Sequence, residues 1–149
     1  KPKNRVLMKG DNNYPQSKSE QVRCDNLAYL MKEIMEKIGT GQKTYDYEPA
    51  KGLWKRLEGP EDVLDLMDTG VDGVIAVIRD AGATFLSPIF DELSGVICTG
   101  GTIRSHIGIV SREFQIPGLI AAEFSNEPEN GTEIILDGTQ TTGSIYLAD

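Results

Sequence analysis

Residues 95–117 read GVICTGGTIRSHIGIVSREFQIP, and this stretch decides the fold prediction. Its first four residues, 95–98, are apolar and predict a buried strand. Two glycines follow, which allow the backbone to turn sharply and to expose N–H groups. Apolar residues then recur at helical spacing, which predicts a helix over 105–114. Ser105 is expected at the N-cap of this helix, which places His106 in its first turn.

Short apolar runs and helical segments alternate on both sides of this stretch. Strands are expected at 51–57, 71–78, 95–98 and 118–122, helices at 61–67, 84–93 and 105–114, and a closing hairpin at 132–136 and 144–147. Strands that alternate with helices favour right-handed βαβ units and a parallel sheet, to which the hairpin adds antiparallel strands. The sequence therefore predicts an α/β fold.

The first third of the chain has a different character. Ser17 and Glu20 form a capping box before an apolar stripe at helical spacing, which predicts a helix over 18–38. Basic residues slightly outnumber acidic ones up to residue 48, whereas acidic residues dominate after it. We therefore expect two parts: residues 1–47, an arm and helix that serve as a linker, a docking element or ordinary packing, and residues 48–149, the main domain.

Composition excludes several classes of function. The chain has 149 residues and a net charge of −8, whereas nucleic-acid and membrane-surface partners favour a basic face. Its two cysteines, Cys24 and Cys98, lie far apart with no histidine cluster beside them, which is typical of reduced thiols in a cytoplasmic protein and does not suggest a metal site. No apolar run is long enough to span a membrane.

His106 is the only histidine of the chain and the centre of its one chemically suggestive stretch. A helix N-terminus attracts anions, and Arg104 and Arg112 are the nearest cations that can pair with phosphate oxygens. An imidazole with a free nitrogen lone pair can take up a phosphoryl group and release it again. Two alternatives stay open: a structural histidine at a helix start, and a Ser/His/Asp triad whose partners lie elsewhere in the chain.

A wider pattern around His106 resembles a known family, the mobile phosphohistidine domain of PEP-utilising enzymes. The resemblance covers roughly residues 48–149. The pattern consists of Gly101-x-x-x-Ser105-His106-x-x-Ile109-Val110-x-Arg112-Glu113-x-x-Ile116-Pro117, Asn130-Gly131, Ile135-Leu136-Asp137-Gly138 and Gly143. Pyruvate phosphate dikinase, PEP synthase, Enzyme I of the sugar phosphotransferase system, rifampicin phosphotransferase and phenylphosphate synthase contain such domains. The resemblance implies a swivelling β/β/α fold, here with an added N-terminal helix.

The resemblance also implies roles for individual residues. His106 would be phosphorylated from ATP or PEP at one active site and would pass the phosphoryl group to pyruvate or an organic alcohol at another. The residues that would shape its loop or contact the phosphate are Gly100, Gly101, Thr102, Arg104, Ser105 and Arg112. The glycine pair stands one position further from the histidine than in the family. Arg104 replaces a regulatory threonine, and Gly108 and Ser111 replace alanines.

The chain is too short to hold the family's ATP-binding domain and PEP-binding barrel. We therefore expect it to bind no cofactor itself and to depend on an ATP-binding and an acceptor-binding partner domain or subunit, with Mg-ATP held by the former. The alternative is a non-catalytic binding or regulatory module with the same fold. The acidic residues at 58–72 are interpreted as a solvated face or as a surface that steers docking to basic partners.

Overall fold

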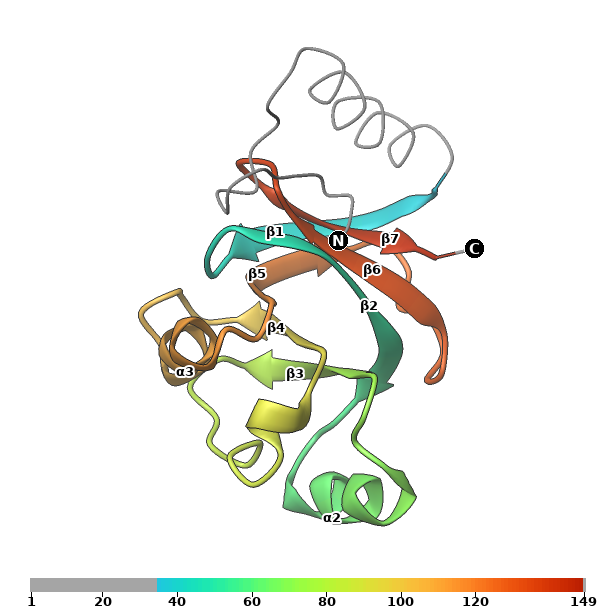
Figure 1. Cartoon of the computed structure of the whole chain (residues 1–149), viewed down its shortest axis with the longest axis vertical. Helices are drawn as coiled ribbons and strands as arrows, with labels where there is room; N and C mark the ends of the chain where they lie inside the picture. The colour runs from blue at the N-terminus through green and yellow to red at the C-terminus, as the bar shows by residue number, and fades with distance from the viewer. Residues whose placement is uncertain (1–34, 149) are drawn as a thin grey trace, which may run out of the picture. The chain divides into compact units, whose positions relative to one another are not determined.

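The computed structural model describes residues 35–148, which contain a closed barrel of seven strands with two α-helices outside it (Figure 1). The strands are β1 (Lys37–Lys43), β2 (Tyr47–Arg56), β3 (Val74–Asp80), β4 (Gly95–Gly100), β5 (Gly118–Phe124), β6 (Glu133–Gly138) and β7 (Gly143–Leu147). The helical elements are α2 (Pro60–Thr69), α3 (His106–Phe114) and the short 3₁₀-helix η1 (Phe90–Glu92).

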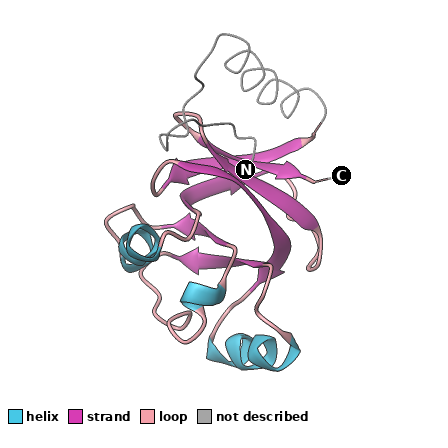
Figure 2. Cartoon of the chain, in the orientation of Figure 1, coloured by secondary structure: helices cyan, strands magenta, loops and turns pink. Residues whose placement is uncertain are grey.

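The order of strands around the barrel is β1-β5-β4-β3-β2-β6-β7, and β7 pairs back to β1. The neighbours β5, β4, β3 and β2 are parallel, whereas every pair that involves β1, β6 or β7 is antiparallel. α2 follows β2 and α3 follows β4, so both helices are crossover segments of the parallel half (Figure 2). The barrel therefore has a parallel half connected through helices and an antiparallel half connected through short turns.

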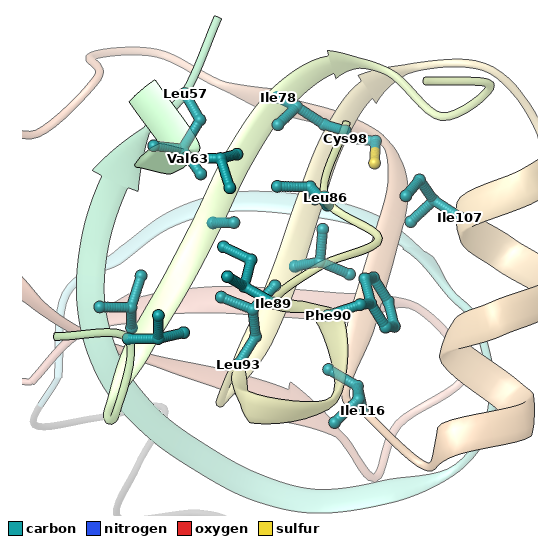
Figure 3. Close-up of a cluster of buried hydrophobic side chains, with 14 of the residues drawn as sticks. Leu57, Val63, Ile78, Leu86, Ile89, Phe90, Leu93, Cys98, Ile107 and Ile116 are labelled. Carbon is teal, nitrogen blue, oxygen red and sulfur yellow. The ribbon is translucent and has the colours of Figure 1, made fainter. Parts of the chain in front are cut away.

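Alternating side chains of the parallel strands enter two separate hydrophobic clusters. In β3, Ile75 and Val77 belong to a cluster that also contains the fully buried Trp54 and residues of β4 to β7. Val74, Ala76 and Ile78 point the other way, into the cluster covered by α2, η1 and α3 (Figure 3). Because both faces of the strand are buried, its sequence is apolar throughout and shows no alternation.

The predicted fold class, a swivelling β/β/α domain with an added N-terminal helix, is wrong. The parallel strands form as expected, but β1, β6 and β7 connect the two outer edges of the parallel half, so the strands close into one barrel instead of stacking in separate layers. Closure satisfies the N–H and C=O groups that would stay unpaired at the edges of an open sheet. β1, absent from the sequence prediction, completes the closure by pairing with both β5 and β7.

Three further predictions concern segments around the barrel. The helix expected at 18–38 lies outside the described residues except for its end, where Lys37 and Ile38 belong to β1. The compact unit accordingly begins at Lys37, ahead of the boundary expected at residue 48. The helix expected at 84–93 is a series of turns that ends in η1. Pro88, which has no N–H to donate, lies in the middle of this segment.

Candidate functional site

His106 is the first residue of α3, and Ser105 occupies the N-cap position in an extended conformation (φ −73°, ψ 168°). His106 is half-buried, and no hydrogen bond among residues 35–148 includes its ring. The next side chain, Ile107, points into the outer hydrophobic cluster beside Cys98 (Figure 3). The helix is therefore anchored through Ile107, while the neighbouring His106 lies outside the hydrophobic clusters.

The loop before His106 is a tight turn with its own hydrogen bonds. Gly101 has a φ of +97°, a conformation that side chains rarely adopt, and a Cβ there would lie 2.6 Å from the Cβ of Ala81. The Thr102 N–H donates to Ser105 Oγ (3.1 Å), and the Ser105 N–H donates to the Thr102 carbonyl (2.9 Å). Ser105 is thus at the predicted N-cap position, but its hydroxyl closes the turn and does not accept a hydrogen bond from a helix N–H.

Ile103, at the centre of the loop, is held against α3 at two points. Its carbonyl oxygen accepts a hydrogen bond from Arg112 Nη1 at 3.0 Å. The same peptide group also packs against Gly108, where a Cβ would lie 2.7 Å from the Ile103 carbonyl carbon. Arg112 therefore links the loop to α3, the helix that carries His106, through this hydrogen bond.

A turn after β3 supports the same loop, and sequence reasoning missed it. The Ala81 carbonyl accepts the N–H of Ile107 at 2.8 Å, and the Ala81 N–H donates to the Gly100 carbonyl at 3.2 Å. Asp80 Oδ1 accepts the Gly82 N–H at 2.8 Å, which shapes the turn. Asp-x-Gly directly after an apolar strand is a recognisable signal for such a turn, because aspartate can hydrogen-bond the backbone two residues on.

The start of α3 is electrostatically suited to an anion. Its first turn has no acidic residue, and the N–H groups of His106 and Gly108 have no acceptor within residues 35–148. Unpaired N–H groups and the helix dipole favour negative charge at this end. Arg104 lies exposed in the adjoining loop, and no salt bridge among the described residues includes it.

Cys98, a second side chain near the loop that could react as a nucleophile, is shielded from solvent. Cys98 lies in β4 at the base of the loop and is fully buried. Burial, followed by the nearby negative charge of Asp80, raises the pKa of its thiol to about 12, so the reactive thiolate is scarce at neutral pH.

Among residues 35–148 no group of His, Cys, Asp and Glu side chains is arranged to hold a metal ion. No helix in that range has the length and apolarity needed to cross a bilayer.

Comparison with protein families matches residues 70–141 to the family described as PEP-utilising enzyme, mobile domain. This match supports the resemblance that the sequence shows between the His106 segment and the mobile domain of PEP-utilising enzymes. The match runs from the turn before β3 to the turn before β7 and includes the whole His106 loop and α3. Domains of this family belong to transferases and normally sit beside partner domains in multidomain enzymes.

Comparison with curated proteins gives no match to this chain. Among solved structures, the chain is similar to RraAS2 from Streptomyces coelicolor, described as an unusual member of the RNase ES inhibitor RraA protein family. The two share 12% sequence identity with a TM-score of 0.46, and the alignment covers 91% of this chain and 87% of that chain.

The predicted site residues of the mobile domain lie on one strand-loop-helix segment. They are Gly100 at the end of β4, Gly101, Thr102, Arg104 and Ser105 in the loop, and His106 and Arg112 in α3. The structure shows two distinct placements among them. Arg112 is engaged with the loop backbone, whereas Arg104 is exposed and available to an external group.

The acidic residues at 58–72 lie on and around α2. Glu58 is paired with Arg79, which donates from Nε and Nη2 at 2.9 and 3.2 Å, and Asp62 accepts the Glu58 N–H at 2.7 Å. Glu61, Asp65 and Asp68 are exposed on the helix. Part of this acidic surface thus serves the local structure, and the docking role predicted for the remainder stays a prediction.

Proposed function

We propose that this chain is a phosphoryl carrier that accepts a phosphoryl group on His106 from ATP or PEP bound in a partner domain. The group then passes to an acceptor, pyruvate or an organic alcohol, held by another partner. The observation that supports this proposal is the position of the single histidine at the open N-terminus of α3, inside the segment that matches the mobile domain. Mg-ATP is expected to bind to the partner domain.

The transfer consists of two displacements at phosphorus. An imidazole nitrogen lone pair attacks the donor phosphorus, the N–P bond forms, and the P–O bond to ADP or to the enolate of pyruvate breaks with its electron pair. The acceptor oxygen then attacks the same phosphorus, and the N–P bond breaks with its electrons returning to the ring. With an alcohol as acceptor, the hydroxyl proton leaves to solvent; pyruvate reacts as its enolate, after its methyl carbon has lost a proton to solvent.

The residues around His106 supply what a bound phosphoryl group needs. Helix N–H groups and the dipole of α3 stabilise its negative charge by about 0.3–1 kcal/mol at an exposed site. Arg104 can reach outward to phosphate oxygens because no described residue engages its side chain in a salt bridge. Arg112, by bracing Ile103, keeps the loop in one arrangement while the ring is modified.

The untagged chain treated with phosphoramidate tests the proposal without any partner. The expected product carries one phosphoryl group in a linkage that is acid-labile and base-stable, detected by intact-mass spectrometry. Because the sequence contains one histidine, a phosphohistidine signal can arise only from His106. His106→Gln should abolish it and keep the native circular dichroism spectrum, while Arg104→Gln should retain it at a lower level.

The alternative function, a non-catalytic module, predicts the opposite result. The chain would then stay unmodified under conditions that phosphorylate N-acetylhistidine, and His106→Gln would leave its cellular activity intact. A further arm adds labelled ATP with Mg²⁺ and an ATP-binding domain of a PEP-utilising enzyme. An adduct on any residue other than His106 would contradict the carrier proposal.

A further inference from the structure

α2 exposes two large apolar side chains that are neighbours on its surface. Leu64 is 62% exposed, more than any other large apolar residue among residues 35–148, and Met67 is 51% exposed. Residues three positions apart lie next to each other on a helix. The side chains that anchor α2 to the outer cluster are others, Val63 and Leu66, which are buried. α2 is therefore held in place without Leu64 and Met67, whose apolar surface is largely exposed.

Acidic residues border this apolar pair. Glu61 and Asp68 lie three and four positions from Leu64 along the helix, and Asp65 is a neighbour of both. All three carboxylates belong to exposed residues, and no salt bridge in the described part of the chain includes them. The sequence has no Lys or Arg within 57–78. We call Glu61, Leu64, Asp65, Met67 and Asp68 the acidic-apolar face of α2.

We propose that the acidic-apolar face of α2 binds a partner protein that presents Lys or Arg side chains around an apolar centre. Neighbouring exposed apolar side chains with a charged rim are typical of a protein contact. Complementary charge across such a contact speeds the encounter and selects the partner. The inference goes beyond the proposed function and does not depend on it.

Charge argues against other occupants of this face. A symmetric contact between two copies of this chain would use the same patch twice, so the carboxylates of one copy would meet those of the other. Like charges that meet across an interface cost free energy. Anionic lipid head groups and the phosphates of nucleic acids would be repelled by the same carboxylates. A basic protein surface is the occupant whose charge complements the face.

The proposed contact is separate from the candidate phosphorylation site. α2 connects β2 to β3, whereas α3, which carries His106, connects β4 to β5 (Figure 1). The partner would thus be recognised by a different crossover helix from the one that presents the imidazole. We therefore expect the contact to form equally well in His106→Gln.

A photo-crosslinking side chain placed on the face identifies what covers it. p-Benzoylphenylalanine replaces Leu64 in the full chain, which is expressed in its source organism and irradiated, and the attached protein segment is identified by mass spectrometry. The matched control carries the same group at Leu53, a 38% exposed residue of β2 whose same-face neighbours on the strand, Lys51 and Lys55, are basic. We expect position 64 alone to capture a segment rich in Lys or Arg.

Removal of the charges tests why that segment binds. The triple variant Glu61→Gln, Asp65→Asn, Asp68→Asn keeps the size of each side chain, and its crosslinking yield at position 64 should fall about tenfold. With the photo-crosslinker moved to Met67, Leu64→Ser should lower the yield about fivefold, because apolar contacts at the centre of an interface contribute most to its affinity. All substituted side chains are exposed, and circular dichroism checks that each variant folds.

Several results would overturn the proposal. They are no captured protein at position 64, a captured segment without basic residues, capture of a second copy of this chain, and capture of the same segment at position 53. An unchanged yield in the triple variant or in Leu64→Ser would do so as well. Loss of the crosslink in His106→Gln would assign the contact to the phosphorylation site and would also contradict it. The reaction of His106 with phosphoramidate decides the carrier function separately, so either proposal can fail alone.

Discussion

α2 and α3 cover the same outer cluster of the parallel half, but they are held there in different ways. α2 is anchored by the buried apolar side chains Val63 and Leu66, and no side chain caps its first turn. α3 adds to Ile107 a close backbone approach at Gly108 and a hydrogen bond from the fully buried Ser111 to the Ile116 carbonyl. Apolar burial is non-directional, whereas close contacts and hydrogen bonds fix an orientation. The position of α3 is thus fixed more specifically than that of α2, because directional contacts add to its apolar burial.

The N-termini of the two helices also differ in the charge of their first turns. α2 carries Glu61 and Asp62 in its first turn, which neutralise the positive end of its own dipole. α3 has no acidic residue there and presents His106 instead. The positive end of the α2 dipole thus has carboxylates of its own beside it, whereas the first turn of α3 has none and favours an external anion.

The largest effect is expected where α2 depends on apolar burial. Leu66→Ala removes a side chain that is 4% exposed and should lower the free energy of unfolding by about 3 kcal/mol, as for other buried leucines. Urea denaturation followed by circular dichroism measures this change. Because α2 does not position His106, phosphorylation by phosphoramidate should be unchanged at temperatures where the variant is folded. A folded variant that has lost the reaction would show that α2 also supports the site.

A smaller loss of stability, but a larger effect on the site, is expected at Gly108 in α3. Alanine is the better helix former by about 1 kcal/mol, yet its Cβ would lie 2.7 Å from the carbonyl carbon of Ile103. Overpacking of this kind costs about 1–3 kcal/mol or more, so we expect Gly108→Ala to lower stability by about 2 kcal/mol in net terms. Displacement of the loop should also slow phosphorylation of His106.

The matched control lies at the start of α2. A Cβ added at Gly59 meets nothing within 4 Å, so Gly59→Ala should change stability by less than ~1 kcal/mol. If Gly108→Ala proved more stable than the wild type, helix propensity would outweigh the contact with Ile103, and the loop would not be held by close packing.

The two helices also show what sequence reasoning could and could not predict. The starts of α2 and α3 were predicted to within a residue, because apolar periodicity and an N-cap serine or a run of acidic residues are local signals. The apolar strand β3 was predicted from an apolar run that both of its buried faces require. Closure of the barrel was not predicted, because β1 has a single large apolar residue, Ile38, and is defined by distant partners in β5 and β7.

The same distinction applies to the candidate site. His106 and its loop were predicted as the site from the local motif; the structure shows that His106 is the first residue of α3, and its role stays a prediction. The two contacts that hold Ile103 against α3 were not predictable. They are the close packing of Gly108 on the Ile103 carbonyl group and the hydrogen bond that Arg112 donates to the same carbonyl oxygen. Gly108 stands where the resemblance expects alanine, and only the folded chain shows that the close loop demands glycine.

The smallest expected effect comes from making the start of α3 electrostatically like that of α2. Ser105→Asp puts a carboxylate at the N-cap, where it can still accept the Thr102 N–H, and Ser105→Asn is the uncharged control of similar size. An added charge next to the incoming phosphoryl group costs about 1 kcal/mol at contact distances in water, which corresponds to roughly a fivefold slower phosphorylation. The rate with phosphoramidate, measured at two salt concentrations, tests this.

The helix itself should be slightly stabilised by the new carboxylate, so the variant should be no less stable than the wild type while reacting more slowly. The difference between Asp and Asn should shrink as salt rises, because a half-exposed charge is screened. Equal rates for Ser105→Asp and Ser105→Asn at low salt would mean that the empty N-terminus of α3 contributes nothing to phosphate binding. The contrast between the two helices would then be one of packing alone.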